Sequence, residues 1–403
     1  MRIAFLTFEY ITESTFDGGL ANYLRRVSIA MQRRGHSVEI FTVSNVDETI
    51  EHDGVIVHRV KPPEQFVGWI RRMTRYYYSH DAVRIIPMAL KMRQRVFHRH
   101  RQAPFDIVQA PNLLSLGLGM TYRSPLPVVI RASSYQPLWR QYDRLTPCNF
   151  SRSTRLIDRI ERHTIRRAVA VYAPSELIAN VFRRYVRPDV DVIRPPFLLD
   201  DIILDSSVYQ EHLTRFRYLL FFGTIKVLKG GITLGDALKY VLPRFSDLHI
   251  VLVGKDMPIK DAPGRSVMQY ILEQAGEWSD RVHHFDRLSR GQLYPIIKGA
   301  SGVILPSRID NFPNTCLEAM AFGKVVIGTE GASFEEMMED GVSGILVPRD
   351  NSVALADAMA RLWQMSEADK VRIGEAAKAR LQPLVPENAC RVLEQYYLKH
   401  VKD

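Results

Sequence analysis

The chain has 403 residues, 46% of them hydrophobic and 24% charged, which is the composition of a folded protein long enough for two domains. Its net charge of +10 lies in the first half, where residues 1–200 carry 30 Lys and Arg against 18 Asp and Glu, yet no nucleic-acid-binding motif accompanies this charge. The chain shows no signal peptide, no apolar run of transmembrane length and no disulfide or zinc pattern in its three cysteines, so we expect a cytoplasmic protein with free thiols.

The beginning of the chain predicts a βαβ unit. Residues 3–8 and 38–43 are short apolar runs that suit strands. Between them lie the pair Gly18 and Gly19 and the segment 20–34, whose apolar residues recur with the period of a helix. Two strands joined by a helix imply a parallel sheet. Further strands are expected at 107–109, 128–130 and 169–173, and a long helix at 153–167.

A basic segment, residues 61–104, interrupts this alternation and is expected to be helical. Its densest stretches, 69–78 and 91–101, place arginines beside Trp, Tyr and Phe. Cations beside aromatic rings suit an anionic membrane surface or a phosphate-bearing acceptor. A solvated helix face explains the same charge equally well, so both explanations stay open.

A second set of alternating segments follows the Pro-rich connection at 194–196. Its predicted strands are 218–222, 248–253, 283–285, 302–305, 325–327 and 345–347. The first two end directly at Gly223 and Gly254, and a strand followed at once by glycine is a place for a ligand at the carboxyl edge of a parallel sheet. The simplest assembly is two Rossmann-like domains, residues 1–198 and 199–385.

The segment Ser307–Gly323 carries two carboxylates, Asp310 and Glu318, on either side of a predicted helix start near Pro313. Unpaired N–H groups at a helix N-terminus suit a diphosphate, and nearby carboxylates accept hydrogen bonds from sugar hydroxyls. This chemistry indicates a nucleotide-sugar site. Thr315 and Glu318 also match a capping box, in which both side chains only satisfy backbone donors.

The same segment resembles the E-x7-E signature of the retaining glycosyltransferases of family 4, with Asp310 in place of the first Glu. Residues 323–329, 331–336 and 341–348 resemble, in order, three further segments of that family. The resemblance implies an α/β protein of GT-B fold, in which two Rossmann-like domains face each other across a cleft. It also implies that the last helix, here within 386–403, packs back on the N-terminal domain.

Residues 223–231 are similar to the family's G-R-L-x-x-x-K-G segment, whose Arg and Lys neutralise the diphosphate of the donor. Gly223 and Lys229 match it, but Thr224 replaces the Arg, and we expect Lys226 to substitute for the missing charge. The resemblance further implies that Glu318 accepts hydrogen bonds from the ribose.

Asp310, by the same resemblance, meets the transferred sugar with a side chain one methylene shorter than the family's Glu. The N–H groups of Asn314, Thr315 and Cys316 are expected to point at the sugar or the distal phosphate. Gly18 and Gly19 match the glycine pair that lets the backbone approach the phosphates.

Many relatives place a His after the strand 128–130, where this chain has Arg131. The implied mechanism is front-face attack, in which the leaving diphosphate helps to take the proton of the acceptor. Such a mechanism needs positive charge on the leaving group more than a strong protein base. Arg131 is a candidate to assist, and a structural ion pair explains it equally well. No metal or other cofactor is expected.

The sequence therefore predicts transfer of a sugar from a nucleoside diphosphate sugar to a saccharide or lipid-linked saccharide, in cell-surface polysaccharide biosynthesis and peripherally at the inner face of the membrane. Two alternatives stay open. A nucleotide-sugar 2-epimerase shares the architecture, and Thr224 with the missing His would also suit a protein that binds a nucleotide sugar without catalysis.

Overall fold

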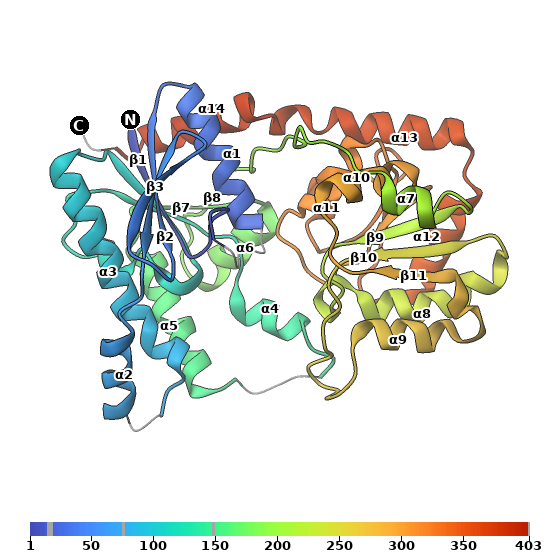
Figure 1. Ribbon diagram of the computed structural model, residues 1–403, viewed down its shortest axis with the longest axis horizontal. Helices are drawn as coiled ribbons and strands as arrows, with labels where there is room; N and C mark the ends of the chain where they lie inside the picture. The colour runs from blue at the N-terminus through green and yellow to red at the C-terminus, as the bar shows by residue number, and fades with distance from the viewer. Residues whose placement is uncertain (14–18, 75–76, 147–149, 402–403) are drawn as a thin grey trace. The chain divides into compact units, whose positions relative to one another are not determined.

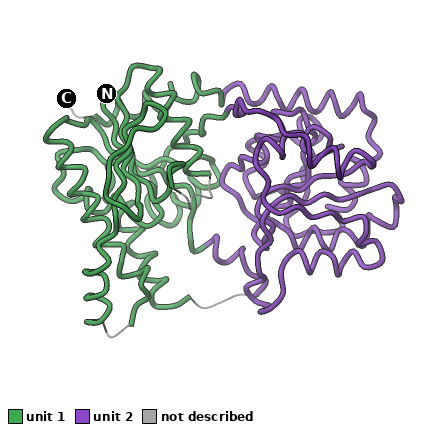
Figure 2. The backbone as a smooth tube through the Cα atoms, viewed as in Figure 1, with its two compact units in different colours: residues 1–137, 149–197, 384–403 green, residues 138–148, 198–383 purple. Residues whose placement is uncertain are grey.

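The computed structural model describes residues 1–13, 19–74, 77–146 and 150–401. Gly18 of the predicted glycine pair and Cys148 lie outside these residues. The chain divides into two compact units, shown in different colours in Figure 2. Unit 1 comprises residues 1–137, 149–197 and 384–403, and unit 2 comprises residues 138–148 and 198–383.

Unit 1 is built on an eight-stranded sheet in the order β3-β4-β2-β1-β5-β6-β7-β8. All neighbouring strands are parallel except β3 and β4. The strands are β1 (Arg2–Thr7), β2 (Ser37–Val43), β3 (Glu48–His52), β4 (Val55–Val60), β5 (Ile107–Pro111), β6 (Val128–Arg131), β7 (Ala170–Ala173) and β8 (Asp191–Val192).

Three helices of unit 1 begin at serine caps. The side chains of Ser79 and Ser151 accept hydrogen bonds from the third residue of α3 and α5, which satisfies one of the free N–H groups at each helix start. The helices are α1 (Gly19–Arg33), α2 (Glu64–Met73), α3 (His80–Gln102), α5 (Arg152–Arg167), α6 (Glu176–Tyr185) and α14 (Pro386–Leu398), while α4 (Gln136–Tyr142) contains the boundary between the units.

The basic segment is helical as predicted, forming α2 and α3. It does not interrupt the alternation, however, because α3 lies in the crossover that leads from β4 to β5 of the same sheet. The hairpin of β3 and β4 was not predicted. Its turn is Asp53-Gly54, both with positive φ, which is a known hairpin signal.

The core of unit 1 joins the first and last parts of the chain. Strands β1, β2 and β5 pack one face against α1 and α14. At its centre the buried Tyr172 hydroxyl donates to Gln109 Oε1 at 2.5 Å, and Tyr397 of α14 donates to the same oxygen. The last helix is therefore part of the core of unit 1.

Unit 2 contains a six-stranded, fully parallel sheet in the order β11-β10-β9-β12-β13-β14. Three strands match their predicted bounds, and the other three agree within two residues. They are β9 (Tyr218–Phe222), β10 (His249–Val253), β11 (Val282–Phe285), β12 (Gly302–Leu305), β13 (Val326–Thr329) and β14 (Ile345–Val347). The predicted α/β class with two Rossmann-like sheets is confirmed.

Helices cover both faces of this sheet: in Figure 1, α8 and α9 lie on one side of β9–β11, and α10 and α11 lie on the other. The helices of unit 2 are α7 (Ser207–His212), α8 (Gly231–Val241), α9 (Val267–Ala275), α10 (Arg290–Gly299), α11 (Asn314–Ala321), α12 (Ser352–Gln364) and α13 (Glu367–Ala379). No helix among the described residues of either unit has an apolar stretch long enough to cross a bilayer.

Candidate functional site

The carboxyl ends of β9 and β10 meet in two glycine turns. The N–H of Gly223 donates to the carbonyl of Val253 at 2.9 Å. Gly254 has a φ of +146°, and a Cβ on this residue would lie 2.0 Å from the carbonyl oxygen of Gly223. Only glycine permits this approach, because any side chain would collide with backbone. The two predicted strand–glycine signals therefore form one tight backbone edge.

The loop after β9 also touches the segment that follows β12. Gly230 has a φ of +78°, and a Cβ there would lie 1.9 Å from the carbonyl oxygen of Pro306. The N–H of Arg308 donates to the carbonyl of Leu228 at 2.9 Å. The loop 223–231 is thereby fixed against the segment that carries Asp310.

Helix α11 starts at this edge without a side-chain cap. Its N-cap is Pro313, whose carbonyl accepts from the N–H of Cys316 at 3.1 Å. Thr315 is the second helical residue, so the capping-box explanation is wrong. The N–H groups of Asn314 and Thr315 donate to no group within the described residues, which leaves two donors at the helix start.

The helix start lies beside the first glycine turn. A Cβ built on Gly223 would lie 3.4 Å from the methyl group of Thr315. At the other end, Gly323 adopts the left-handed conformation, with a φ of +66°, as predicted for the residue that ends this helix. The short helix is therefore held with its N-terminus at the carboxyl edge of the sheet.

Asp310 and Lys229 form an ion pair, although 81 residues separate them in the chain. The Asp310 carboxylate also accepts from the N–H of Asn311 at 3.0 Å and lies 3.5 Å from the Ser307 hydroxyl. Asp310 and Glu318 are 7% and 6% exposed, so both carboxylates are largely shielded from solvent. The structure thus brings one predicted cation and one predicted carboxylate into contact.

Lys226 adds a second ammonium group to the loop. Its side chain forms no hydrogen bond or ion pair with any residue that the structure describes. Burial lowers its pKa below the usual value and the charge of Lys229 lowers it further, while Asp143 and Asp310 oppose the shift. Lys229 has a carboxylate partner and Lys226 has none among the described residues, so positive charge remains uncompensated. Such charge suits the binding of a diphosphate.

Asp143 is a residue of this edge that the sequence did not reveal. Its carboxylate accepts from the N–H of Leu228 at 3.3 Å and from Lys260 Nζ at 2.5 Å. It thereby contacts the loop 223–231, which carries Lys226 and Lys229 and which we call the lysine loop. Asp143 lies in the segment 138–148, which belongs to unit 2 although it lies within the N-terminal half of the chain. No local motif marks this contact, since 85 residues separate the two partners.

Thr224 follows Gly223 in the loop of unit 2, whereas the predicted residues Gly19 and Arg131 belong to unit 1. Gly19 is the exposed first residue of α1. Arg131 ends β6 and is only 7% exposed, with its guanidinium 3.9 Å from the centre of the Tyr23 ring. Its Nε atom is buried without a hydrogen-bond partner within the described residues. The structure therefore gives Arg131 a cation–π contact where an ion pair was the alternative expectation.

Comparison with known families covers both units. Residues 216–365 match the model of glycosyl transferases group 1, and residues 18–196 match the model of the glycosyl transferase 4-like domain. An O-antigen chain mannosyltransferase C from Escherichia coli is 30% identical over 380 residues, which are 91% of this chain and 90% of that protein. An alpha-D-kanosaminyltransferase from Streptomyces kanamyceticus is 28% identical over 66% of this chain and 67% of its own length.

Solved structures agree on the fold. A sucrose-phosphate synthase from Thermosynechococcus elongatus has a TM-score of 0.75 at 20% identity, covering 99% of this chain and 98% of its own. An Anabaena protein solved in complex with UDP and glucose has a TM-score of 0.69 at 18% identity, covering 99% of this chain and all of its own. The chain belongs to the group 1 glycosyl transferases of family 4, retaining enzymes of GT-B fold that transfer a sugar from a nucleotide sugar.

Proposed function

We propose that this enzyme transfers a hexose from a nucleoside diphosphate sugar, bound at the carboxyl edge of the unit 2 sheet, to a saccharide or lipid-linked saccharide of cell-surface polysaccharide biosynthesis. The observation that carries the donor site is the lysine loop. Lys226 and Lys229 lie beside the uncapped start of α11, where two N–H groups are free to bind an anion. The diphosphate of the donor matches this charge.

Each side chain of the site has a distinct task in this proposal. Lys229 and Lys226 neutralise the diphosphate and stabilise it as a leaving group. When the phosphates engage Lys229, the Asp310 carboxylate is released from its ion pair to accept hydrogen bonds from the transferred sugar. Glu318 accepts from the ribose. The leaving diphosphate takes the proton of the acceptor hydroxyl, so no strong protein base is required.

For the acceptor we propose a cavity of about 310 Å³ in unit 1, located at the carboxyl ends of β1, β2 and β4. Its wall combines the ring of Phe8 and the side chain of Met88 with polar Asn45. Leu114, with a φ of +59°, adds a strained backbone to the lining, a feature that clusters at functional sites. Ligands of α/β proteins bind at such strand ends.

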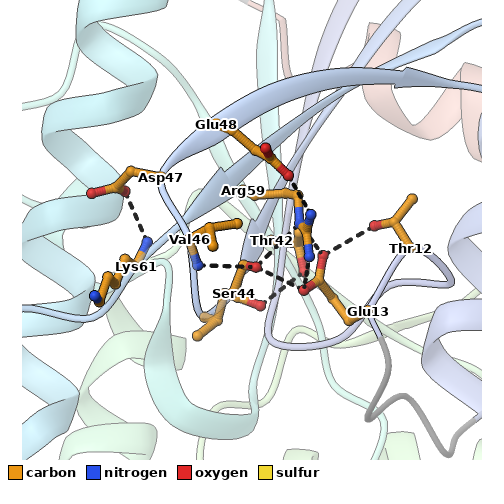
Figure 3. A network of polar contacts seen from close by, with 10 residues as sticks. Thr12, Glu13, Thr42, Ser44, Val46, Asp47, Glu48, Arg59 and Lys61 are labelled. Atoms are coloured by element: carbon orange, nitrogen blue, oxygen red, sulfur yellow. Dashed lines mark hydrogen bonds and ion pairs between the residues drawn. The ribbon is translucent and has the colours of Figure 1, made fainter.

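A network of polar groups forms one side of this cavity (Figure 3). The Glu13 carboxylate accepts from the Ser44 hydroxyl at 2.7 Å, from Arg59 Nε at 2.9 Å and from the Thr12 hydroxyl at 3.1 Å. Burial raises the pKa of the Glu13 carboxyl, but these hydrogen bonds have the larger effect. The pKa is therefore lower than its usual value, and the carboxyl is ionised. An ionised carboxylate and a fixed guanidinium suit vicinal sugar hydroxyls, and an apolar wall suits the C–H face of a sugar ring.

The name of one relative supports a saccharide acceptor, because the Escherichia coli protein is named for the O-antigen chain. A lipid-linked acceptor would lie in a membrane, and the basic helices α2 and α3 suit an anionic surface. We therefore propose that the enzyme acts peripherally at the inner face of the membrane.

A thermal-shift screen of nucleotides and nucleotide sugars tests the donor site. One nucleotide sugar should raise the melting temperature, since a ligand at 100 times its Kd stabilises the folded state by about 2.7 kcal/mol. Lys229→Ala and Glu318→Ala should lose the shift, whereas Lys239→Ala on the exposed side of α8 should keep it. No shift with any nucleotide sugar contradicts the proposal.

A second assay measures release of the nucleoside diphosphate with and without saccharide acceptors. It separates a transferase from an epimerase and from a protein that only binds nucleotide sugars. Transfer that depends on the acceptor supports the proposal. A shift without turnover would instead support a protein that only binds nucleotide sugars, and conversion of the donor without an acceptor would support an epimerase.

A further inference from the structure

Unit 1 contains a second and larger cavity, about 720 Å³, between α3, the short turn η2 (Leu118–Thr121) and α5. We call it the α3–α5 groove. It is formed by close packing at its base, where a Cβ on Gly119 would lie 2.7 Å from the carbonyl oxygen of Ala89 in α3. The groove is thus a built feature of the fold and not a gap between loops.

The floor and walls of the groove are apolar and open to solvent. Ile86 and Leu90 lie one helical turn apart on α3 and are 48% and 52% exposed. Tyr122 is 43% exposed, and Ile160 of α5 completes the lining. Large aliphatic side chains in a shared hollow indicate a surface that is covered by a partner.

The lining also contains two arginines that no described residue of the chain binds. Arg123 and Arg159 are exposed, and neither guanidinium forms a hydrogen bond or ion pair within the described part of the chain. Arg123 also has a φ of +44°, an unfavourable conformation for a residue with a side chain. By contrast, Arg93 is fixed by donating to the carbonyls of Gly119 and Tyr122.

The lining therefore combines exposed aliphatic carbon with uncompensated positive charge. A nucleic acid would match the charge but not the aliphatic carbon, because its bases stack on aromatic rings. A neutral protein surface would match the carbon but leave both guanidiniums without an anion. A phospholipid matches both, since its phosphate and its acyl chain are joined in one molecule.

We propose that the α3–α5 groove docks the enzyme on the surface of an anionic lipid bilayer. Lipid phosphates bind Arg123 and Arg159, and acyl carbons pack against Ile86 and Leu90. This inference rests on the proposed membrane association and assigns that association to one surface. It does not depend on the donor site.

A second surface of unit 1, on α2, is the alternative candidate for membrane binding. On α2, Phe66, Trp69 and Met73 are 50%, 56% and 64% exposed and follow each other at helical spacing. Arg72 is exposed on the same helix, whereas Arg71 has a buried Nε. The α2 stripe has more aromatic surface, but it is not part of the α3–α5 groove. The experiment must therefore separate the two surfaces.

The test is sedimentation of the full chain with vesicles of 30% phosphatidylglycerol in phosphatidylcholine, with pure phosphatidylcholine as reference. Because one arginine near an anionic surface contributes about fivefold to partitioning, the double variant Arg123→Ser and Arg159→Ser should bind roughly 30-fold more weakly. Leu90→Asn should also weaken binding, through the lost apolar contact. Thermal unfolding verifies that each variant is folded.

The matched control removes the same charge elsewhere in unit 1, with Arg33→Ser on α1 and Arg184→Ser on α6, two exposed positions outside α2, α3 and the groove. It should bind nearly as well as the wild type. Equal loss in the control and in the groove variant, or loss only in Trp69→Ser and Met73→Ser of α2, would overturn the proposal. Absence of vesicle binding by the wild type would overturn it together with the membrane association. The proposed enzyme activity is tested separately on the same samples, by the thermal shift with the nucleotide sugar and by transfer to a soluble acceptor.

Discussion

Glu39 is a carboxylate in the middle of strand β2, with a side chain only 1% exposed. It accepts from Arg99 Nε at 2.9 Å and from His58 Nε2 at 2.7 Å, and it forms an ion pair with Arg2. Burial raises the pKa of its carboxyl, but these three partners outweigh burial and lower the pKa to about 2. The charge of Glu39 is therefore stabilised by the fold.

Glu39→Gln should lower the free energy of unfolding at pH 7 by roughly 3 kcal/mol, because it leaves partly buried cations without their anion. The folded pKa lies below the unfolded one, so the contribution is complete above about pH 5 and is lost as the pH falls toward 2. Urea titrations between pH 2.5 and 7 measure this dependence. Glu176→Gln, an exposed partner of Arg183, should cost less than about 1 kcal/mol. An unchanged acid dependence in Glu39→Gln would contradict the assignment.

Lys226 shows the opposite relation between stability and function. Burial and the nearby Lys229 disfavour its charge in the absence of a ligand. Lys226→Met should therefore raise the melting temperature of the ligand-free protein at pH 7, and this gain should fade as the pH approaches 10.5, where the unfolded lysine also loses its proton. Binding of the nucleoside diphosphate should weaken by about tenfold or more. Calorimetry measures both effects, and a variant that is less stable yet binds normally would refute this role.

At this scale the sequence predicted residue types better than contacts. The resemblance pointed to Asp310 and Lys229, and the structure shows them paired. Nothing in the sequence pointed to Asp143, because a single Asp in an irregular segment has no pattern and its partners are distant in the chain. The contact of Arg131 with the Tyr23 ring was also not predicted, because the spacing of residues in the sequence does not indicate such a contact.

At the scale of elements, the edge of unit 2 depends on glycines whose replacement the geometry forbids. Gly230→Ala would place a Cβ 1.9 Å from the carbonyl oxygen of Pro306 in addition to the strain of a positive φ. We expect a loss of about 2 kcal/mol or more in stability and the loss of the donor thermal shift. Gly264→Ala is the matched control.

Gly264 has nearly the same φ, +82°, but no atom lies within 4 Å of the position that a methyl group on this residue would take. Its replacement should cost only the strain of about 1 kcal/mol and leave the donor shift intact. Equal effects of the two substitutions would show that the contact with Pro306 is unimportant. Thermal unfolding with and without the nucleotide sugar provides both readouts.

The elements themselves were largely predictable, because buried parallel strands are short apolar runs bounded by glycine. The strands β9, β12 and β14 have their predicted bounds for this reason. The hairpin of β3 and β4 was missed because its strands carry polar residues such as Glu48 and Glu51 on an exposed edge. The capping box failed because Pro313, and not Thr315, precedes the first helical turn.

At the scale of the whole molecule, each unit has its own hydrophobic core, and α14 contributes to that of unit 1. Leu393 is 2% exposed in this core, so Leu393→Ala should lower the free energy of unfolding by about 2–5 kcal/mol. Val392 precedes it on the same helix but is 50% exposed, and Val392→Ala should change stability by less than about 0.5 kcal/mol. Denaturant unfolding of both variants measures the difference, and similar values would contradict the role of α14 in the core.

The contact between Gln109 and Tyr397 spans 288 positions of the chain. During synthesis the strands of unit 1 leave the ribosome first, yet the helix that completes their core leaves only after all of unit 2. Unit 2, whose residues all precede Leu384, has everything it needs to fold earlier. The nascent enzyme therefore carries an unfinished first half until α14 has left the ribosome, and premature termination between the end of unit 2 and α14 yields a chain whose second half can fold while its first half stays open to chaperones and proteases.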